Sequence, residues 1–202
     1  SSAISGANSI LNLQGGYNGV LALPSNPYSP TDGFLSQFKI NAAGRLVAFD
    51  GAFSNDSTAI VACTMDGFIQ TLAIWERPLG DPHWQVPMDE VEAKMYDICR
   101  TYQVREIAAD PYRWASVLQK WESDGLPVVL YSQSPARMVP ACASFADAVA
   151  QEKLSHNGDP VLARHLDNCT VKIDRFGPRV VKEHKGSARK IDAGVCADRK
   201  SV

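Results

Sequence analysis

The 202-residue sequence lacks several features that mark large classes of protein. No apolar run approaches the ~18 residues that a membrane-spanning helix requires, and no basic segment followed by an apolar one opens the chain. No Cys-x-x-Cys pair occurs, and no histidine stands at a zinc-ligand spacing from a cysteine. We therefore expect a soluble protein that is not exported, contacts no membrane and holds no zinc.

The five cysteines are also informative through their arrangement. They are odd in number and scattered along the chain, at positions 63, 99, 142, 169 and 196. Disulfide frameworks use even, clustered sets, and they form in oxidising compartments. The pattern predicts reduced, mostly buried thiols in a cytoplasmic setting.

The net charge of −2 hides an uneven distribution along the chain. Residues 1–163 hold 10 Lys and Arg against 17 Asp and Glu, and residues 164–202 hold 10 against 5. A basic segment of this kind is suited to phosphate groups, although it is equally compatible with a solvated basic face. The candidate DNA-binding residues are Lys172, Arg179, Lys182, Lys185, Arg189 and Lys190.

The first part of the chain predicts an arm followed by an antiparallel meander. Residues 1–44 are poor in charge and rich in Ser, Asn, Gly and Pro, which is typical of an arm or linker. Apolar runs at 46–49, 57–64 and 68–75 predict three strands, with Asp66-Gly67 as a hairpin signal. We therefore place the folded domain at residues 45–202.

The rest of the chain alternates helices with strands. Helical periodicity or helix signals occur at 87–102, 112–122, 136–152 and 161–166, and a last helix begins near Asp192. Strands are predicted at 106–109 and 127–131, and a hairpin at 169–173 and 179–181. Three antiparallel strands followed by βαβ units predict an α/β fold with one mixed sheet flanked by helices.

Three acids stand where this fold would bring side chains together. Asp50 ends the first strand, Asp110 ends the fourth, and Asp192 opens the last helix. Hydrolysis of a phosphodiester by two metals needs carboxylates from separate segments that hold two cations ~3.5–4 Å apart. Each acid alone has a structural explanation, as a turn former or at a helix N-terminus. Together, in this strand order, they indicate a metal-dependent nuclease.

Four stretches resemble the nuclease motifs of the large terminase subunits of tailed bacteriophages. These are VAFDGAFSNDSTA at 47–59, EIAADPY at 106–112, KLSHNGDPVL at 153–162 and KIDAGVCA at 190–197. They occur in the family's order and span about residues 45–200. The resemblance implies an RNase H-like fold, Mg²⁺ or Mn²⁺ at a two-metal site, and cutting of concatemeric double-stranded viral DNA during packaging.

The resemblance also implies roles for single residues and partners. Asp50, Asp110 and Asp192 would be the catalytic and metal-binding triad, and Asp56 is a possible fourth ligand, although a turn aspartate is the simpler interpretation. His156 and His165 are expected to be structural or at the surface. The implied partners are an ATPase motor domain, the portal and the small terminase subunit, in the host cytoplasm.

One part of the family pattern is missing. The chain has no Gly-x-x-x-x-Gly-Lys-Ser/Thr loop, so we expect no bound nucleotide here and interpret residues 1–44 as the join to a motor domain. Two alternatives stay open: another RNase H-like resolvase- or integrase-type nuclease, and a non-catalytic DNA-holding module of a packaging motor. The second alternative does not need three converging acids.

Overall fold

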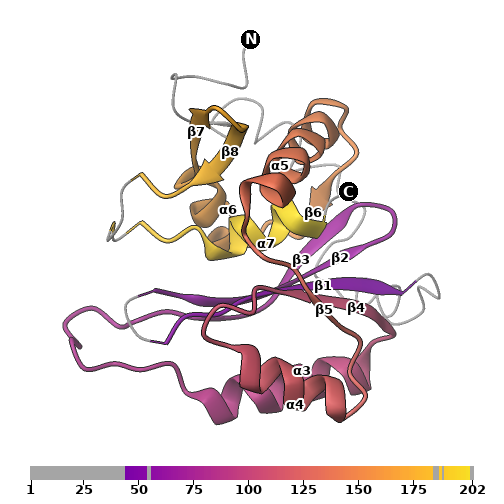
Figure 1. The fold of residues 1–202 in the computed structure, drawn as a ribbon, viewed down its shortest axis with the longest axis vertical. Coiled ribbons are helices and arrows are strands. Elements are labelled where there is room, and N and C mark those ends of the chain that lie inside the picture. The colour runs from indigo at the N-terminus through magenta and orange to yellow at the C-terminus, as the bar shows by residue number, and fades with distance from the viewer. Residues whose placement is uncertain (1–43, 54–55, 184–186, 188, 201–202) are drawn as a thin grey trace.

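The computed structural model describes residues 44–53, 56–183, 187 and 189–200, and it forms three layers around a central sheet. Figure 1 shows the sheet across the middle, helices α3 and α4 on one face, and the last third of the chain on the other. The predicted arm at residues 1–43 and Lys185 lie outside the described residues.

The sheet has six strands in the order β5-β4-β1-β2-β3-β6. The strands are β1 Arg45–Asp50, β2 Thr58–Thr64, β3 Phe68–Trp75, β4 Val104–Ala109, β5 Val128–Leu130 and β6 Ser155–His156. The meander β1-β2-β3 is antiparallel, while β4 pairs parallel with β1 and β5 parallel with β4. The predicted mixed sheet is confirmed.

Strand β6 was not predicted. It contains two residues and pairs parallel with the start of β3. Its sequence lies in a turn-rich stretch with no alternation of apolar residues, so its strand geometry comes from docking on the edge of the sheet rather than from local preference.

Helices cover both faces of the sheet. Their bounds are α3 Met88–Thr101, α4 Ala115–Ser123, α5 Pro135–Ala150, α6 Pro160–Asp167 and α7 Asp192–Lys200. The hairpin of β7 Thr170–Asp174 and β8 Gly177–Val181 forms a separate two-stranded sheet beside α5. None of the helices in the described residues is long and apolar enough to cross a membrane.

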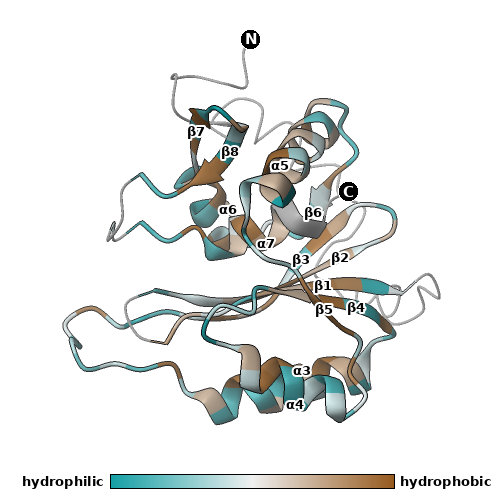
Figure 2. Ribbon diagram, in the orientation of Figure 1, coloured by the Kyte–Doolittle hydropathy of each residue, from teal (hydrophilic) through white to brown (hydrophobic). Residues whose placement is uncertain are grey.

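Alternation along the central strands divides the interior into two hydrophobic cores. Val47 and Phe49 of β1 face α3 and α4, whereas Ala48 between them faces the layer of α5, α6 and α7. A strand with both faces covered carries apolar residues at successive positions, and all seven residues of β2 are buried. Figure 2 shows hydrophobic residues along the sheet and hydrophilic ones on the outer helices.

The cysteines take the state that the sequence predicts. All five are free thiols, and every one except the half-buried Cys99 is buried. Burial raises the pKa of the Cys99 thiol, which keeps it protonated.

Candidate active site

Asp50 and Asp110 leave the sheet side by side. Strands β1 and β4 are parallel and pair Phe49 with Ala109, so the next residue of each strand emerges at the same edge. Gln133, which follows β5, contacts both acids: its side-chain Nε2 donates to Asp50 Oδ1 at 2.9 Å, and its backbone N–H donates to Asp110 Oδ2 at 3.3 Å. One residue therefore connects the two carboxylates.

The chain after Asp110 corrects a sequence prediction. Helix α4 begins at Ala115, not at Tyr112, and Pro111 does not open it. Asp110 Oδ1 instead accepts the backbone N–H of Tyr112 at 3.0 Å, and Arg113 adopts a left-handed conformation with φ 64°. A left-handed residue cannot continue a helix, so Asp110 closes a tight turn rather than capping the helix.

A tryptophan fixes the turns beside these acids. Trp114 is buried, meets Phe49 edge-on at a centroid distance of 4.7 Å and stacks on Phe53 at 5.3 Å. Gly51 lies against the same indole, and a Cβ atom there would approach its ring to 2.4 Å. The residue after Asp50 must be glycine for the Trp114 ring to pack this closely.

Asp192 approaches the same edge from the opposite layer. It is the first residue of α7, which packs on β1 and β2, and it is only 6% exposed. Its Oδ2 accepts a short hydrogen bond from Ser57 Oγ. Burial, together with the negative charges of Asp50 and Asp56, raises the pKa of Asp192 to about 7. The repulsion indicates that Asp50 and Asp192 face a common space.

Asp56 has a different environment. Its Oδ2 pairs with the ammonium group of Lys182, and its Oδ1 lies 3.3 Å from Lys190 Nζ. Burial alone would raise the pKa of Asp56, but the hydrogen bond and the charges of the two lysines lower it. Both carboxylate oxygens are engaged by cations, so in this arrangement Asp56 anchors the segments that carry Lys182 and Lys190.

The other predicted DNA-binding residues differ in their freedom. Arg179 is largely covered and pairs with Asp174 at 2.7 Å across the β7–β8 hairpin. Arg189 is exposed, with Glu183 at 4.0 Å, and Lys172 is exposed on β7. The exposed cations that could meet a phosphate without breaking a short internal ion pair are therefore Lys172 and Arg189.

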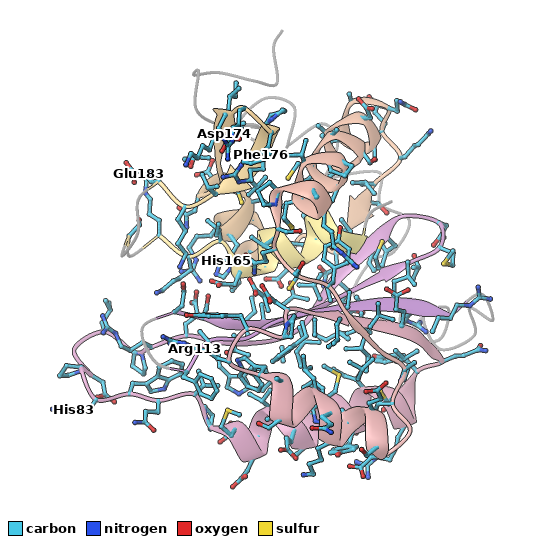
Figure 3. All side chains as sticks on the ribbon, in the orientation of Figure 1. His83, Arg113, His165, Asp174, Phe176 and Glu183 are labelled. Atoms are coloured by element: carbon cyan, nitrogen blue, oxygen red, sulfur yellow. The ribbon has the colours of Figure 1, made fainter. Side chains whose placement is uncertain are left out.

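Both histidines considered in the sequence are buried. His156 accepts the backbone N–H of Gly158 at Nδ1, and burial lowers its pKa to about 4. His165, on α6, lies between the sheet and the outer layer (Figure 3), where its ring contacts Glu76 and the backbone of Ala193. Burial lowers the pKa of His165 against the opposing effect of Glu76. The structural interpretation of these residues is confirmed, and a surface location is excluded.

The donors at this edge have the chemistry of a site for a hard divalent cation. Among the described residues, no three His, Cys, Asp or Glu side chains converge as a ready ligand set for a metal ion. However, Asp50, Asp110 and Asp192 offer carboxylate oxygens, which Mg²⁺ and Mn²⁺ prefer, and the raised pKa of Asp192 reports uncompensated negative charge. A cation would relieve that repulsion, so the residues fit the ion in chemistry.

Three neighbours of the acids were missed by sequence reasoning. Ser57 precedes β2, Glu76 follows β3 and Gln133 follows β5, and each lies at the same edge as Asp50. A signal existed for two of them, because polar residues just beyond strand ends meet at one edge of a sheet. Ser57 offered none, since a serine before a strand is ordinary turn chemistry.

Comparison with known proteins connects this geometry to a family. Residues 83–197, which include Asp110 and Asp192, match the family model of the terminase large subunit, endonuclease domain. The chain is 29% identical over 166 residues to the gene 13 proteins of Mycobacterium phages L5 and D29. That alignment covers 75% of this chain and 28% and 27% of the two relatives, so the chain spans less than a third of their length.

Solved structures share the fold. The large terminase of bacteriophage HK97 superposes with a TM-score of 0.66 at 20% identity, over 83% of this chain and 42% of that one. The large terminase nuclease of thermophilic phage G20c with bound magnesium gives 0.58 at 14% identity, over 80% and 82% of the two chains. These likenesses confirm the predicted RNase H-like fold. With the family match over more than half of its length, the chain belongs to the endonuclease-domain family of terminase large subunits.

Proposed function

We propose that this domain is a divalent-metal-dependent endonuclease that cleaves double-stranded viral DNA during genome packaging. The observation that carries the proposal is the convergence of Asp50, Asp110 and Asp192 on one edge of the sheet, from three separate segments. Family membership supports hydrolysis of phosphodiesters rather than another use of the same acids. Neighbouring nuclease structures with bound magnesium and cobalt support a divalent ion.

In this proposal Asp50, Asp110 and Asp192 hold Mg²⁺ or Mn²⁺. When bound, the ions supply positive charge that stabilises the negative charge developing on the phosphodiester in the transition state. Asp50 is a candidate for a bridging ligand because it neighbours both Asp110, through Gln133, and Asp192, through their mutual repulsion.

Other residues of the chain orient these acids. Ser57 directs one oxygen of Asp192 by donating to it, and Gln133 holds the other two carboxylates from β5. Lys182, fixed by Asp56, places a cation close enough to oppose the rise in the pKa of Asp192. A rigid, hydrogen-bonded surround of this kind lowers the cost of organising the site for reaction.

The wider biological role is part of the proposal. The chain covers under half of the HK97 large terminase, and structures of the large terminase of another thermophilic bacteriophage are in complex with ATP-γ-S and with ADP. We propose that a motor domain, the portal and the small terminase subunit are partners, that residues 1–44 join the motor, and that the site of action is the host cytoplasm.

A plasmid-nicking assay tests the proposal. With Mn²⁺ the wild-type protein should nick supercoiled DNA and with EDTA it should not, whereas D50N, D110N and D192N should each lose at least about a hundredfold in rate. Asp97→Asn, an exposed acid on α3, is the matched control and should retain full activity. Near-normal nicking by D110N overturns the assignment, and DNA binding without any nicking favours the DNA-holding module.

A further inference from the structure

A buried polar relay links α6 to the first turn of α7. The side chain of His165 is fully buried, and its Nδ1 lies 3.0 Å from the backbone N of Ala193, the residue after Asp192. The opposite ring nitrogen, Nε2, lies 2.8 Å from Glu76 Oε1. The other carboxylate oxygen of Glu76 accepts from Arg164 Nη2 at 2.7 Å. The relay therefore runs from the surface ion pair, through the imidazole, to the helix that carries Asp192.

The partners fix the protonation of the ring. A backbone N–H can only donate, so Nδ1 is the acceptor and carries no proton. The ring proton is then on Nε2 and points at the Glu76 carboxylate. Each ring nitrogen thus has one directional partner, and the imidazole is held in a single orientation.

The contact satisfies a group that helices leave open. The first four N–H groups of a helix have no partner inside it, and a buried one is costly unless something accepts it. At Ala193 the acceptor is the His165 ring. Ser57 holds the Asp192 side chain from the other direction, so the acid is constrained through both its backbone and its carboxylate.

Two further contacts bracket Asp192 on α6. Asn168 Nδ2 donates to the carbonyl oxygen of Lys190 at 3.0 Å, two residues before the acid. Two residues after it, Gly194 approaches so closely that a Cβ would lie 2.8 Å from Cys169 Sγ and 3.3 Å from the His165 carbonyl oxygen. The C-terminal half of α6 is thus a docking surface for residues 190–194.

We propose that His165, oriented by Glu76, is a positioning residue that fixes the first turn of α7 and thereby directs Asp192 toward Asp50. The inference rests on the proposed function, in which Asp192 is a metal ligand. His165 is fully buried and both of its ring nitrogens are engaged, so it acts through Asp192 and not on DNA.

Two amide substitutions separate the two ends of the ring. Asparagine places its amide near the position of Nδ1, and glutamine places it near that of Nε2. His165→Asn should therefore keep an acceptor for Ala193, whereas His165→Gln should keep only the contact with Glu76. Hydrogen exchange of the intact protein should show first-turn amides of α7 exchanging at least about tenfold faster in H165Q than in wild type, and little changed in H165N.

Metal affinity gives the second readout, with Mn²⁺ itself as the probe in titration calorimetry. We expect H165N to bind within about threefold of wild type and H165Q to bind about tenfold or more weakly, the range that loss of an outer-shell partner produces. Ile98→Ala, buried on α3 in the opposite core, controls for lost stability and should bind as wild type does. Wild-type affinity in H165Q, or an equal loss in I98A, overturns the proposal.

The two readouts separate this inference from the proposed function. If wild type binds Mn²⁺ and D192N does not, the metal assignment holds, and H165Q decides on positioning. If wild type binds no Mn²⁺, the metal assignment fails and the positioning of a metal ligand falls with it. The exchange rates then still show whether His165 holds α7. Unchanged exchange in H165Q contradicts the relay regardless of metal.

Discussion

At the scale of single residues, Asp192 carries the strongest electrostatic conflict in the site. It is buried at 6% exposure, and the charges of Asp50 and Asp56 add to the cost of ionising it. The hydrogen bond from Ser57 and the charge of Lys182 compensate only in part, because the pKa of Asp192 remains raised to about 7. The carboxylate that would bind metal is therefore the one that the metal-free fold disfavours.

This conflict predicts an unusual dependence of stability on pH. An acid with a raised pKa keeps its proton in the folded state where the unfolded chain, with a pKa near 3.8, has lost it. Unfolding then releases a proton between about pH 4 and pH 7, so rising pH favours unfolding. Below pH 4 both states are protonated and the effect disappears.

Asp192→Asn isolates the effect. Asparagine cannot ionise, yet its oxygen still accepts from Ser57, so in EDTA the variant should be more stable than wild type by a few kcal/mol at pH 8 and nearly equal at pH 4. Urea denaturation at the two pH values measures the difference. His156, whose pKa is lowered to about 4, is common to both proteins and cancels. A difference that shrinks as pH rises would contradict the environment assigned to Asp192.

At the scale of elements, the sequence predicted what local pattern controls. Alternation and apolar runs identified the main strands, and the order of strands and helices identified the sheet. The start of α4 was wrong because Arg113 takes a left-handed conformation that Trp114 packing supports and no propensity predicts. The two-residue β6 was missed because its conformation depends on the edge of β3.

The site followed the same division. Asp50 and Asp110 could be placed at one edge because parallel strands end together. The contacts around Asp192 could not be placed, because Ser57 lies 135 positions from Asp192 and His165 lies 28 positions from Ala193. Only tertiary packing brings these segments to α7. The pairing of Asp56 with two lysines of the C-terminal segment also depends on tertiary packing, so no local pattern indicated it.

The contact between α6 and α7 gives a prediction at this scale. Gly194→Ala should push α7 away from α6, because the new Cβ would meet Cys169 Sγ at 2.8 Å. We expect a loss of about 1–3 kcal/mol in stability, typical of overpacking, together with weaker Mn²⁺ binding. Cys169→Ala removes the colliding sulfur, so the double variant should recover part of both losses. Purely additive effects in thermal melts would show that the two residues do not meet.

At the scale of the whole molecule, much of the basic charge is neutralised inside the fold. The basic C-terminal segment supplies Lys182 and Lys190 to Asp56, and Arg179 to Asp174. Cations held in this way neutralise acids near the site and release fewer counterions on binding DNA. The surface available to a phosphate backbone is therefore smaller than the sequence alone suggested, and it includes Lys172 on the hairpin.

Salt dependence of DNA binding tests this distribution. Affinity for a short duplex should fall steeply with salt and depend little on base sequence, because phosphate contacts carry no sequence information. Lys172→Gln should lower the slope of log K against log salt by about one, and Lys182→Gln by less. Lys94→Gln, on α3 in the opposite layer, should leave the slope unchanged. A salt-independent complex would exclude a phosphate-based interface.

Binding of metal should also stabilise the whole domain. An ion that binds the folded site but not the unfolded chain adds RT ln(1 + [L]/Kd), about 1.4 kcal/mol at ten times Kd. For a domain of this size the melting temperature should rise by about 3–5 °C with Mn²⁺, and by less with Mg²⁺. The rise should be largest above pH 7, where Asp192 is ionised without a cation. Thermal melts in EDTA and in Mn²⁺ should show a much smaller rise for D192N than for wild type. I98A, with its defect in the opposite core, should melt lower in EDTA and gain the full shift. Equal gains in wild type and D192N would mean that Asp192 is not a ligand, and that its raised pKa reflects burial beside Asp50 alone.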